Sequence, residues 1–379
     1  MFSGLKYLIV GCGFSGAVFA ERIAAVLGEK VLIIEERDHI GGNSWSEKDS
    51  ETGIECHRYG SHIFHTNNCR VWEYISKFGD FTGYRHRVLT NCRSKVYSMP
   101  INLHTINAFT GTTYSPREAA AFIAGETSKA NIKTPRNLEE KAISLIGREL
   151  YEAFIKNYTI KQWGTHPAEL PESIINRLPV RTTYNTDYFD DLWQGVPRKG
   201  YFSLFRNMLS SPKIEIRTGI RYEDIRQEIP RDCKIIFTGM IDSFFDCRFG
   251  QLDWRSLKFE WETLQLQDFQ GTSVMNYADL SVPYTRIHEF KHYHPERTEI
   301  FTSKQTVICR EFPDTYAAGK NAYYPVNDEK NNRLFARYRE ESAQLPNVIF
   351  AGRLGSYKYL DMDQAIAQAL ELFDLKLVC

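Results

Sequence analysis

Hydrophobic residues recur along this chain at two spacings, and the spacings predict where strands and helices lie. Short apolar runs at 7–10, 234–237 and 348–351 have the length of buried strands. Between 17 and 27 the apolar residues recur instead at helical spacing, and residues 30–34 return to strand-forming types. The order strand, helix, strand is typical of a parallel sheet, and the later runs predict that the chain returns to this sheet.

A glycine motif, GCGFSG at 11–16, joins the first predicted strand to the first predicted helix. Gly11 permits a tight turn, Gly13 lets backbone amides approach a pyrophosphate, and Gly16 lets the helix pack close to the strand. Glu35 ends the second strand, nineteen residues after Gly16, where a carboxylate would accept hydrogen bonds from a ribose. The motif therefore predicts a Rossmann-type dinucleotide site, whose contacts include the two residues between the last glycines, Phe14 and Ser15.

A second glycine pair indicates which dinucleotide binds. Gly41 and Gly42 precede Asn43 and let the chain return to the pyrophosphate. The stretch 35–43 resembles the extension of FAD-binding Rossmann proteins of the amine-oxidase type rather than that of NAD dehydrogenases. FAD is therefore the expected cofactor, with Gly42 and Asn43 among its contacts.

The middle of the chain has other patterns. A hairpin is predicted at 87–98, a mostly helical stretch follows from 103 to 157, and short β-type segments separated by turns recur between 257 and 310. We predict an α/β fold in which a discontinuous FAD-binding Rossmann-type domain carries a helical insertion and an antiparallel β-sheet substrate domain. The predicted boundaries are 1–83, 200–250 and 340–379 for the Rossmann-type domain, 100–176 for the helical domain, and 84–99, 177–199 and 251–339 for the sheet domain.

Composition narrows the class of partner. The 379 residues suffice for two or three domains, and lysine plus arginine equals aspartate plus glutamate at 47 each. No bulk charge therefore favours nucleic acid or an anionic membrane, and local arginines must meet any anionic ligand. The apolar runs are too short to span a bilayer and no signal peptide precedes the first strand, so we expect a cytoplasmic protein.

Cysteine and histidine spacing argues against a metal. The eight cysteines are scattered without a CxxC pair, as is typical of free thiols in a reducing compartment. His62 and His65 lie three residues apart, but no further ligand set accompanies them. We expect no metal site.

Residues 158–188 predict an ordered loop that moves over the substrate. The segment carries Trp163, Gly164 as a hinge, and three prolines that disfavour long helices. We place the mobile part at about 163–181. The alternative is a rigid interdomain linker in which Trp163 is merely packed.

Ordered motifs then converge on one family. They are GCGFSG at 11–16, IGGN at 40–43, YGSHIFHT at 59–66, KQWG at 161–164, LPVR at 178–181, WRSL at 254–257, PYTR at 283–286, YYPV at 323–326, GRL at 352–354 and YLDM at 359–362. Over nearly its whole length the chain resembles bacterial UDP-galactopyranose mutases. Trp254 departs from the tyrosine expected of the family, which puts in doubt only the contacts beside Arg255.

The resemblance implies a reaction and partners. The reaction interconverts UDP-galactopyranose and UDP-galactofuranose without net redox change, yet needs reduced FAD. It implies that flavin N5 attacks the anomeric carbon and displaces UDP, that the adduct opens to an iminium, and that ring closure and return of UDP give the furanose. A homodimer and an unidentified reductant are also implied, as is a part in the biosynthesis of a cell-surface polysaccharide.

The resemblance also assigns residues by motif position. Arg177 and Arg286 would neutralise the diphosphate, because forked guanidinium groups suit phosphate. The other substrate contacts implied are Tyr188, Tyr324, Tyr359, Phe154, Tyr158, Thr159, Asn276, Trp163 and His86. The further flavin contacts implied are His62, Ile63, His65, Gly239, Arg255, Arg353, Tyr359, Asp361 and Met362. The catalytic set is then Arg177, Arg286, His65 and Trp163.

Simpler explanations stay open for several of these residues. Core packing would account for Phe154 and Tyr158, a structural hydrogen bond for His65, and surface salt bridges for the arginines. A pocket for UDP-N-acetylgalactose, an amine-oxidase-like flavin oxidoreductase, and a catalytically silent FAD protein that recognises nucleotides are the alternative functions.

Overall fold

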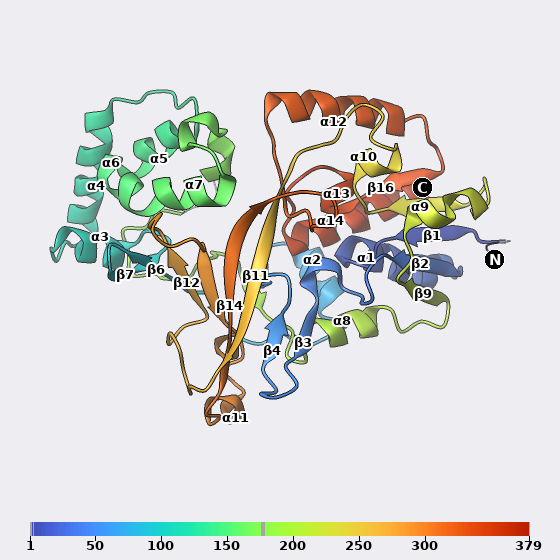
Figure 1. Ribbon diagram of the computed structural model, residues 1–379, viewed down its shortest axis with the longest axis horizontal. Coiled ribbons are helices and arrows are strands. Elements are labelled where there is room, and N and C mark those ends of the chain that lie inside the picture. Colours follow the sequence, from blue (N-terminus) through green and yellow to red (C-terminus); the bar gives the residue numbers. More distant parts are fainter. Residues whose placement is uncertain (1, 3, 176–178, 379) are drawn as a thin grey trace.

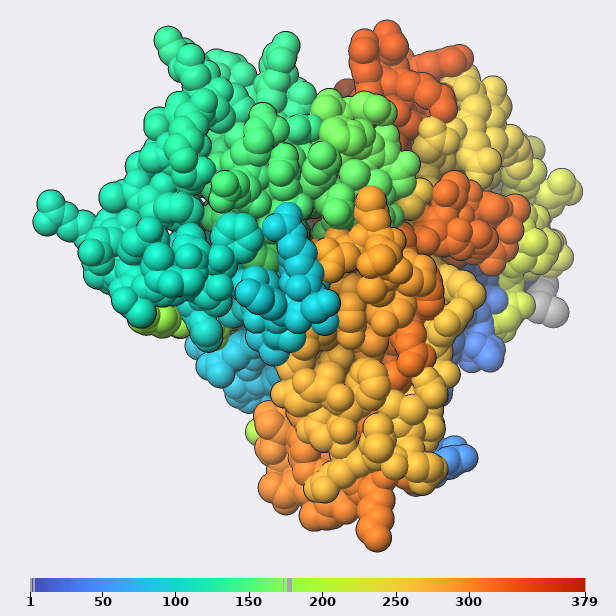
Figure 2. All heavy atoms as spheres, turned by 60° about the vertical axis from the view of Figure 1, so that its left-hand side comes forward, coloured from blue at the N-terminus to red at the C-terminus, as the bar shows by residue number. Residues whose placement is uncertain are grey.

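The computed structural model describes residues 2, 4–175 and 179–378, which build a parallel sheet, a long mixed sheet and a group of helices (Figure 1). The long strands of the mixed sheet stand between the helical group and the parallel sheet (Figure 1). Figure 2 shows the helical residues, in teal and green, side by side with residues of the mixed sheet in orange. In the described part of the chain, no helix combines the length and the apolar character needed to cross a bilayer.

The parallel sheet has the strand order β16-β10-β1-β2-β9. Its strands are β1 (Tyr7–Val10), β2 (Val31–Glu35), β9 (Ile214–Thr218), β10 (Lys234–Phe237) and β16 (Val348–Phe350). Strand alternation divides the apolar residues between two faces: Ile9 packs with α1 (Phe14–Arg22) and α14 (Met362–Phe373), whereas Leu8 and Val10 pack against Tyr222 on the other face. The predicted return of the late apolar runs to this sheet is confirmed.

Further helices surround this sheet. They are α2 (Cys69–Ile75), α8 (Gly200–Met208), α9 (Tyr222–Ile225), α10 (Ile241–Phe244), α12 (Glu329–Ser342) and α13 (Gly352–Gly355). Asp328 caps α12 by accepting a hydrogen bond from the amide of Asn331.

The helical insertion consists of α3 (Leu103–Thr110), α4 (Pro116–Ala130), α5 (Leu138–Ile146), α6 (Arg148–Leu150) and α7 (Asn157–Trp163), with a π-helical stretch, Tyr151–Lys156, before α7. A capping box begins α4: the Ser115 hydroxyl accepts from the amide of Glu118, and the Glu118 carboxylate accepts from the amide of Ser115. Gly147 breaks the helix after α5 with φ +78°, and a Cβ there would lie 2.5 Å from Cβ of Glu126. Only glycine fits this break.

The second sheet has the order β15-β11-β14-β13-β12-β6-β7. Its strands are β6 (Val88–Cys92), β7 (Lys95–Met99), β11 (Trp254–Leu264), β12 (Val274–Tyr277), β13 (Arg286–Glu289), β14 (Thr306–Thr315) and β15 (Tyr324–Pro325), and α11 (Thr298–Phe301) lies at its tip. The predicted antiparallel pairing holds except between β12 and β6, which pair in parallel. Because β6 comes from a distant part of the chain, no hairpin turn fixes its direction, and the sheet is mixed.

Two short ribbons were not predicted. β3 (Ser46–Lys48) pairs with β4 (Glu55–His57), and β5 (Phe64–Thr66) pairs with β8 (Trp193–Gly195). Three-residue strands carry too little periodicity to be recognised from sequence. The β5–β8 ribbon matters for the site because it joins the histidine-containing loop 59–66 to the segment after the predicted mobile loop.

Candidate active site

The glycine turn between β1 and α1 forms a cradle that a side chain would fill. Gly11 has φ +97°, and a Cβ on Gly16 would lie 2.0 Å from the carbonyl oxygen of Gly11. Gly42 comes back against this turn, since its Cβ would lie 3.1 Å from Cα of Gly13. No side chain caps the start of α1 at Gly13, so the positive end of the helix faces the cradle.

Glu35 and Arg37 lie at the end of β2, beside the cradle. The Glu35 carboxylate accepts hydrogen bonds from the amides of Cys12 (2.8 Å) and Arg37 (3.0 Å), so it also ties the glycine turn to the end of β2. Arg37 donates to Asn43 and Asn321 and lies 4.4 Å from the centre of the Tyr59 ring. Sequence reasoning did not single out Arg37, although it lies in the stretch 35–43 that indicated FAD.

Two buried donors at this cradle lack an acceptor. They are Nη1 of Arg37 and the hydroxyl of Tyr323. Buried polar groups are normally paired, so these donors fit a site shaped for a polar ligand. Together with the glycine cradle, these two donors fit a dinucleotide.

The loop 59–66 places its two histidines in different surroundings. His62 contacts the Gly60 carbonyl through Nδ1 at 2.8 Å, and burial lowers its pKa to about 4, so it is neutral at pH 7. The Nδ1 atom of His65 lies 2.9 Å from the Asp191 carboxylate, and its ring stacks on Phe189 with centroids 3.7 Å apart. The Asp191 contact is the structural hydrogen bond weighed for His65, and Ile63 is buried beside them.

A row of rings runs from the helical insertion to the Rossmann-type part. The Trp163 ring lies 6.2 Å from Tyr324, and Tyr324 stacks on Tyr359 at 5.6 Å and 16°. The guanidinium of Arg353 lies 4.4 Å from the centre of the Tyr359 ring and donates to the carbonyl of Leu360 at 2.7 Å. Burial raises the pKa of Tyr324 well above 10, so its hydroxyl stays a neutral donor.

Arg286 lies in a network that includes a buried carboxylate. Its Nη2 donates to the hydroxyl of Tyr158 at 2.5 Å, and its Nε lies 3.3 Å from the carboxylate of Glu311. His288 lies 3.1 Å from the other oxygen of Glu311. Burial alone would raise the pKa of Glu311, but Arg286 and His288 lower it. Sequence reasoning missed Glu311, because only the strand register places it opposite Arg286.

Asn276 stands directly opposite Arg286 in the β12–β13 register. Its Oδ1 is buried without a hydrogen-bond donor, and Nε of Arg286 also lacks a well-aligned acceptor. A buried amide oxygen without a donor, opposite a guanidinium held by Glu311 and Tyr158, suits a ligand that offers both a donor and anionic oxygens. Thr159 is buried nearby on α7.

The remaining substrate candidates are aromatic. Tyr188 donates its amide to the carbonyl of His86 at 2.7 Å, and burial lowers the pKa of His86 to about 3. Phe154 packs in the core of the helical insertion against Tyr97 and Phe109, with ring centroids 5.0 and 5.5 Å away. The contacts of Phe154 are thus those of core packing, and its stacking on uracil stays a prediction.

Three flavin candidates lie at element ends. Arg255 donates to the carbonyl of Gln162 at the end of α7 and to Thr315, so its contacts connect β11 to the helical insertion. Gly239 follows β10. Asp361 caps α14, which begins at Met362.

Arg177 lies outside the described residues, so its role stays a prediction. The described residues around it show that α7 ends at Trp163 and that Gly164 takes the left-handed conformation, φ +69°. A Cβ on Gly164 would lie 3.1 Å from the guanidinium of Arg255. Glycine is therefore required where the loop 163–181 begins.

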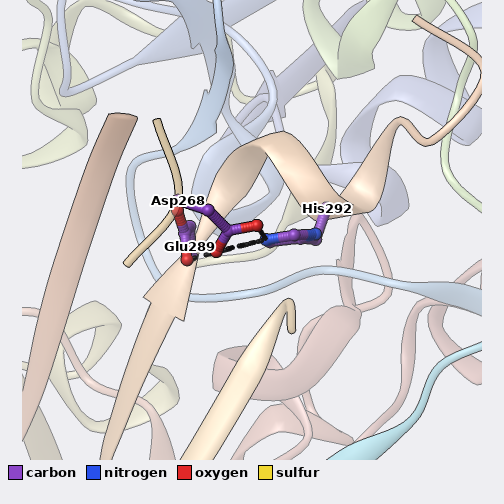
Figure 3. A group of neighbouring side chains, drawn as sticks. All are labelled: Asp268, Glu289 and His292. Atoms are coloured by element: carbon purple, nitrogen blue, oxygen red, sulfur yellow. Dashed lines mark hydrogen bonds and ion pairs between the residues drawn. The ribbon is translucent and has the colours of Figure 1, made fainter. Parts of the chain in front are cut away.

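One cluster with metal-like spacing occurs in the described part of the chain, at the tip of the mixed sheet. Asp268, Glu289 and His292 point toward one another there (Figure 3). Glu289 already accepts hydrogen bonds from Thr306 and from the backbone amide of Gln270, and His292 contacts both carboxylates. This cluster is a hydrogen-bonded tie for the loop that contains Asp268.

Comparisons with known proteins agree with this geometry. A family profile described as UDP-galactopyranose mutase matches residues 153–359, and one described as NAD(P)-binding Rossmann-like domain matches residues 9–78. A solved structure of reduced UDP-galactopyranose mutase has a TM-score of 0.74 at 16% identity, covering 99% of this chain and 94% of that one. At that identity the structural likeness establishes the fold.

Curated relatives extend over almost the whole chain. It is 41% identical to a dTDP-fucopyranose mutase of Escherichia coli, covering 98% of each chain. It is 42% identical to a probable UDP-galactopyranose mutase of Klebsiella pneumoniae, covering 97% of this chain and 93% of the relative. A UDP-galactopyranose mutase of Mycoplasma genitalium is 33% identical, covering 96% and 93%. The chain therefore belongs to the UDP-galactopyranose mutase family, and by that membership it is an isomerase.

Proposed function

We propose that the protein interconverts UDP-galactopyranose and UDP-galactofuranose with FAD in its reduced form. The observation that carries the proposal is the pair formed by Arg286 and Asn276: the Oδ1 of Asn276 is buried without a donor, and Arg286 opposite it donates to Tyr158 of α7. The row from Trp163 through Tyr324 and Tyr359 to Arg353 connects this pair's surroundings to the glycine cradle. A nucleotide sugar and a dinucleotide would thus lie within reach of each other.

The cradle residues suit FAD. Gly11, Gly13 and Gly42 leave room for the pyrophosphate, and Glu35 would hold the ribose. Reduced FAD, when bound, supplies a nucleophilic nitrogen for the anomeric carbon of the sugar. Arg353, beside the ring row, would stabilise negative charge on the reduced ring.

The substrate residues have separate tasks. Arg286 would hold the departing diphosphate, because a guanidinium forms two parallel hydrogen bonds with phosphate. The hydroxyls of Tyr324 and Tyr359 would donate to its remaining oxygens. Trp163 would cover the sugar and exclude water when the loop 163–181 closes.

The test compares reduced and oxidised protein. Dithionite-reduced protein incubated with UDP-galactofuranose should yield UDP-galactopyranose, separable from it by anion-exchange chromatography, and oxidised protein should yield none. Equal rates in the two states would refute the role of reduced FAD. Flavin that reoxidises in proportion to product would instead identify an oxidoreductase of the amine-oxidase kind, and UDP binding without ring contraction would identify a silent binding protein.

A second substrate is favoured by a specific observation. The dTDP-fucopyranose mutase of Escherichia coli is 41% identical over 98% of both chains, as similar as the UDP-galactose relative. We therefore propose dTDP-fucopyranose as the second candidate. Reduced protein should be given UDP-galactose, dTDP-fucose and UDP-N-acetylgalactose in parallel, and the highest kcat/KM identifies the substrate.

Assembly and location complete the proposal. We infer a homodimer that works in the cytoplasm, where a cellular reductant supplies electrons to FAD. The seven described cysteines are free thiols, as suits a reducing compartment. Light scattering at micromolar concentration should give twice the mass of the 44.0 kDa chain.

A further inference from the structure

Lys161 places an ammonium group among four backbone carbonyls. Its Nζ lies 2.6 Å from the carbonyl oxygen of Tyr277, 3.0 Å from that of Asp279, 3.1 Å from that of Val282 and 3.0 Å from that of Tyr284. An ammonium has three N–H groups, so every donor is engaged and one is shared. Burial lowers the pKa of Lys161 to about 8, so the charged form still prevails at pH 7.

The four carbonyls belong to the segment that joins β12 to β13. Asn276 precedes this segment and Arg286 follows it, and the two residues face each other in the register. Lys161 itself lies on α7, between Tyr158 and Trp163. The Lys161 side chain therefore ties α7, which carries Tyr158 and Trp163, to the segment between Asn276 and Arg286.

This tie crosses between the helical insertion and the mixed sheet, which share one hydrophobic core. The segment 277–285 has its own internal bonds, with Tyr277 donating its amide to the carbonyl of Thr285 and Val282 to that of Asp279. Its carbonyls nonetheless converge on a side chain of the helical insertion. The Asp279 carbonyl also accepts from the amide of Val282, but without a cation the four carbonyls would lose their shared charged donor in a partly buried space, which costs free energy.

Resting on the proposed function, we propose that Lys161 is a positioning residue of the mutase reaction, which sets the distance between the nucleotide-sugar contacts of α7 and those of β12 and β13. Lys161 touches neither substrate nor flavin in this role. It acts through Tyr158 and Trp163 on one side and through Asn276 and Arg286 on the other.

Lys291 offers a matched control for a purely structural lysine. It is fully buried, and its Nζ donates to the carbonyls of Gln267 and Gln305 at the tip of the mixed sheet. Burial lowers its pKa as well. Lys161 and Lys291 thus have the same chemistry, but only Lys161 adjoins the candidate active site.

The experiment compares Lys161→Met with Lys291→Met in the purified flavoprotein. Melting temperature, flavin content, the Kd for UDP and for dTDP by calorimetry, and the steady-state kcat and KM are measured for both. Both variants should melt earlier and keep their flavin. Lys161→Met alone should bind the nucleotide more weakly and lose about a hundredfold in kcat/KM, the cost of a misplacement near 1 Å.

Two results would overturn the proposal. One is an equal loss of kcat/KM in the two variants at equal loss of melting temperature, and the other is unchanged nucleotide Kd in Lys161→Met. If Lys161→Met does not fold, Lys161→Gln, which keeps an NH₂ donor, is used in its place. It should also weaken nucleotide binding and lower kcat/KM relative to Lys291→Met, but by a smaller factor. Failure of the proposed function is distinguishable, because wild-type protein would then convert no sugar while the nucleotide Kd still reports on Lys161.

Discussion

At the scale of single residues, the candidate site depends on charges that are paired before any ligand arrives. Arg286 has Glu311 on one side and Tyr158 on the other, and Glu311 is shared with His288. A carboxylate fixed in this way keeps the Arg286 guanidinium in one orientation. Less side-chain entropy is then lost when a ligand binds to this arginine. The pairing also makes Glu311 costly to change, because its removal leaves a poorly solvated cation.

Arg286 and Glu311 should be tested as a pair. Arg286→Ala should lower kcat/KM by about a thousandfold, as loss of a charge-stabilising donor does, while flavin content stays unchanged. Glu311→Gln should cost about 3 kcal/mol of unfolding free energy, the lower end for a broken buried ion pair. In the Arg286→Ala background, Glu311→Gln should cost less, because the cation it balances is gone.

Denaturant titration and flavin absorbance of the four proteins measure this cycle. Additive losses of stability would show that the two residues do not interact. Loss of flavin from Arg286→Ala would move this arginine out of the substrate site.

At the scale of secondary-structure elements, the helical insertion depends on where glycine is required and where it is not. Gly147 has φ +78° and would clash with Glu126 if it carried a Cβ. Gly125, inside α4, has no atom within 4 Å of an added Cβ. Replacement by alanine should therefore change the free energy of unfolding in opposite directions at the two glycines.

Gly147→Ala should lower the unfolding free energy by about 1–3 kcal/mol, the cost of a strained backbone position. Gly125→Ala should raise it by about 0.5–1 kcal/mol, because alanine is the better helix former. Thermal unfolding followed by circular dichroism measures both. A stabilised Gly147→Ala would contradict the left-handed break.

The tie at the tip of the mixed sheet predicts a dependence on pH. Burial alone would raise the pKa of Glu289, but hydrogen bonds from His292, Thr306 and two backbone amides lower it to about 2. A depressed carboxyl pKa contributes stability that is present above about pH 4.3, the unfolded value, and is lost as pH falls toward 2. His292 has the opposite sign: its pKa is raised, so its contribution is present below about pH 6.5 and is lost as pH rises through the folded value.

Glu289→Gln should therefore remove part of the acid sensitivity. Melting temperatures of wild type and variant, measured from pH 7 to pH 3, should converge as the pH falls. A constant difference between them across this range would show that Glu289 titrates normally in the folded protein.

At the scale of the whole molecule, polar and aromatic contacts join three parts of the chain at the site. Arg255 of β11 connects the mixed sheet to the end of α7, Lys161 connects α7 to the β12–β13 segment, and Tyr324 of β15 stacks on Tyr359 next to α14. The dinucleotide cradle lies on the far side of this junction from the helical insertion. A ligand that binds the cradle should therefore stabilise the whole protein by mass action.

Gly16→Ala tests the cradle. Its Cβ would lie 2.0 Å from the carbonyl oxygen of Gly11, so the turn must distort. The variant should purify with little flavin, and added FAD should raise its melting temperature less than that of wild type. Full flavin content, read from the ratio of absorbance at 450 and 280 nm, would place the dinucleotide elsewhere.

Short-range features of this protein were legible in the sequence. The glycine turn of 11–16 was predicted from its motif, because it depends on residues within a few positions of one another, as do the capping box at Ser115 and the break at Gly147 that the structure shows. The apolar strands of the parallel sheet were legible too, because full burial on both faces demands an unbroken apolar run.

Only the tertiary structure decided which distant residues meet. The opposition of Glu311 to Arg286, the contact of Asp191 with His65, the parallel pairing of β12 with β6 and the carbonyls around Lys161 all join segments far apart in the chain. The residues next to each of these in the sequence do not predict such partners. Strand register and the packing of elements depend on burial summed over whole elements. The local sequence therefore determined the elements and the dinucleotide motif, and the packing of those elements decided which charges are paired at the candidate active site.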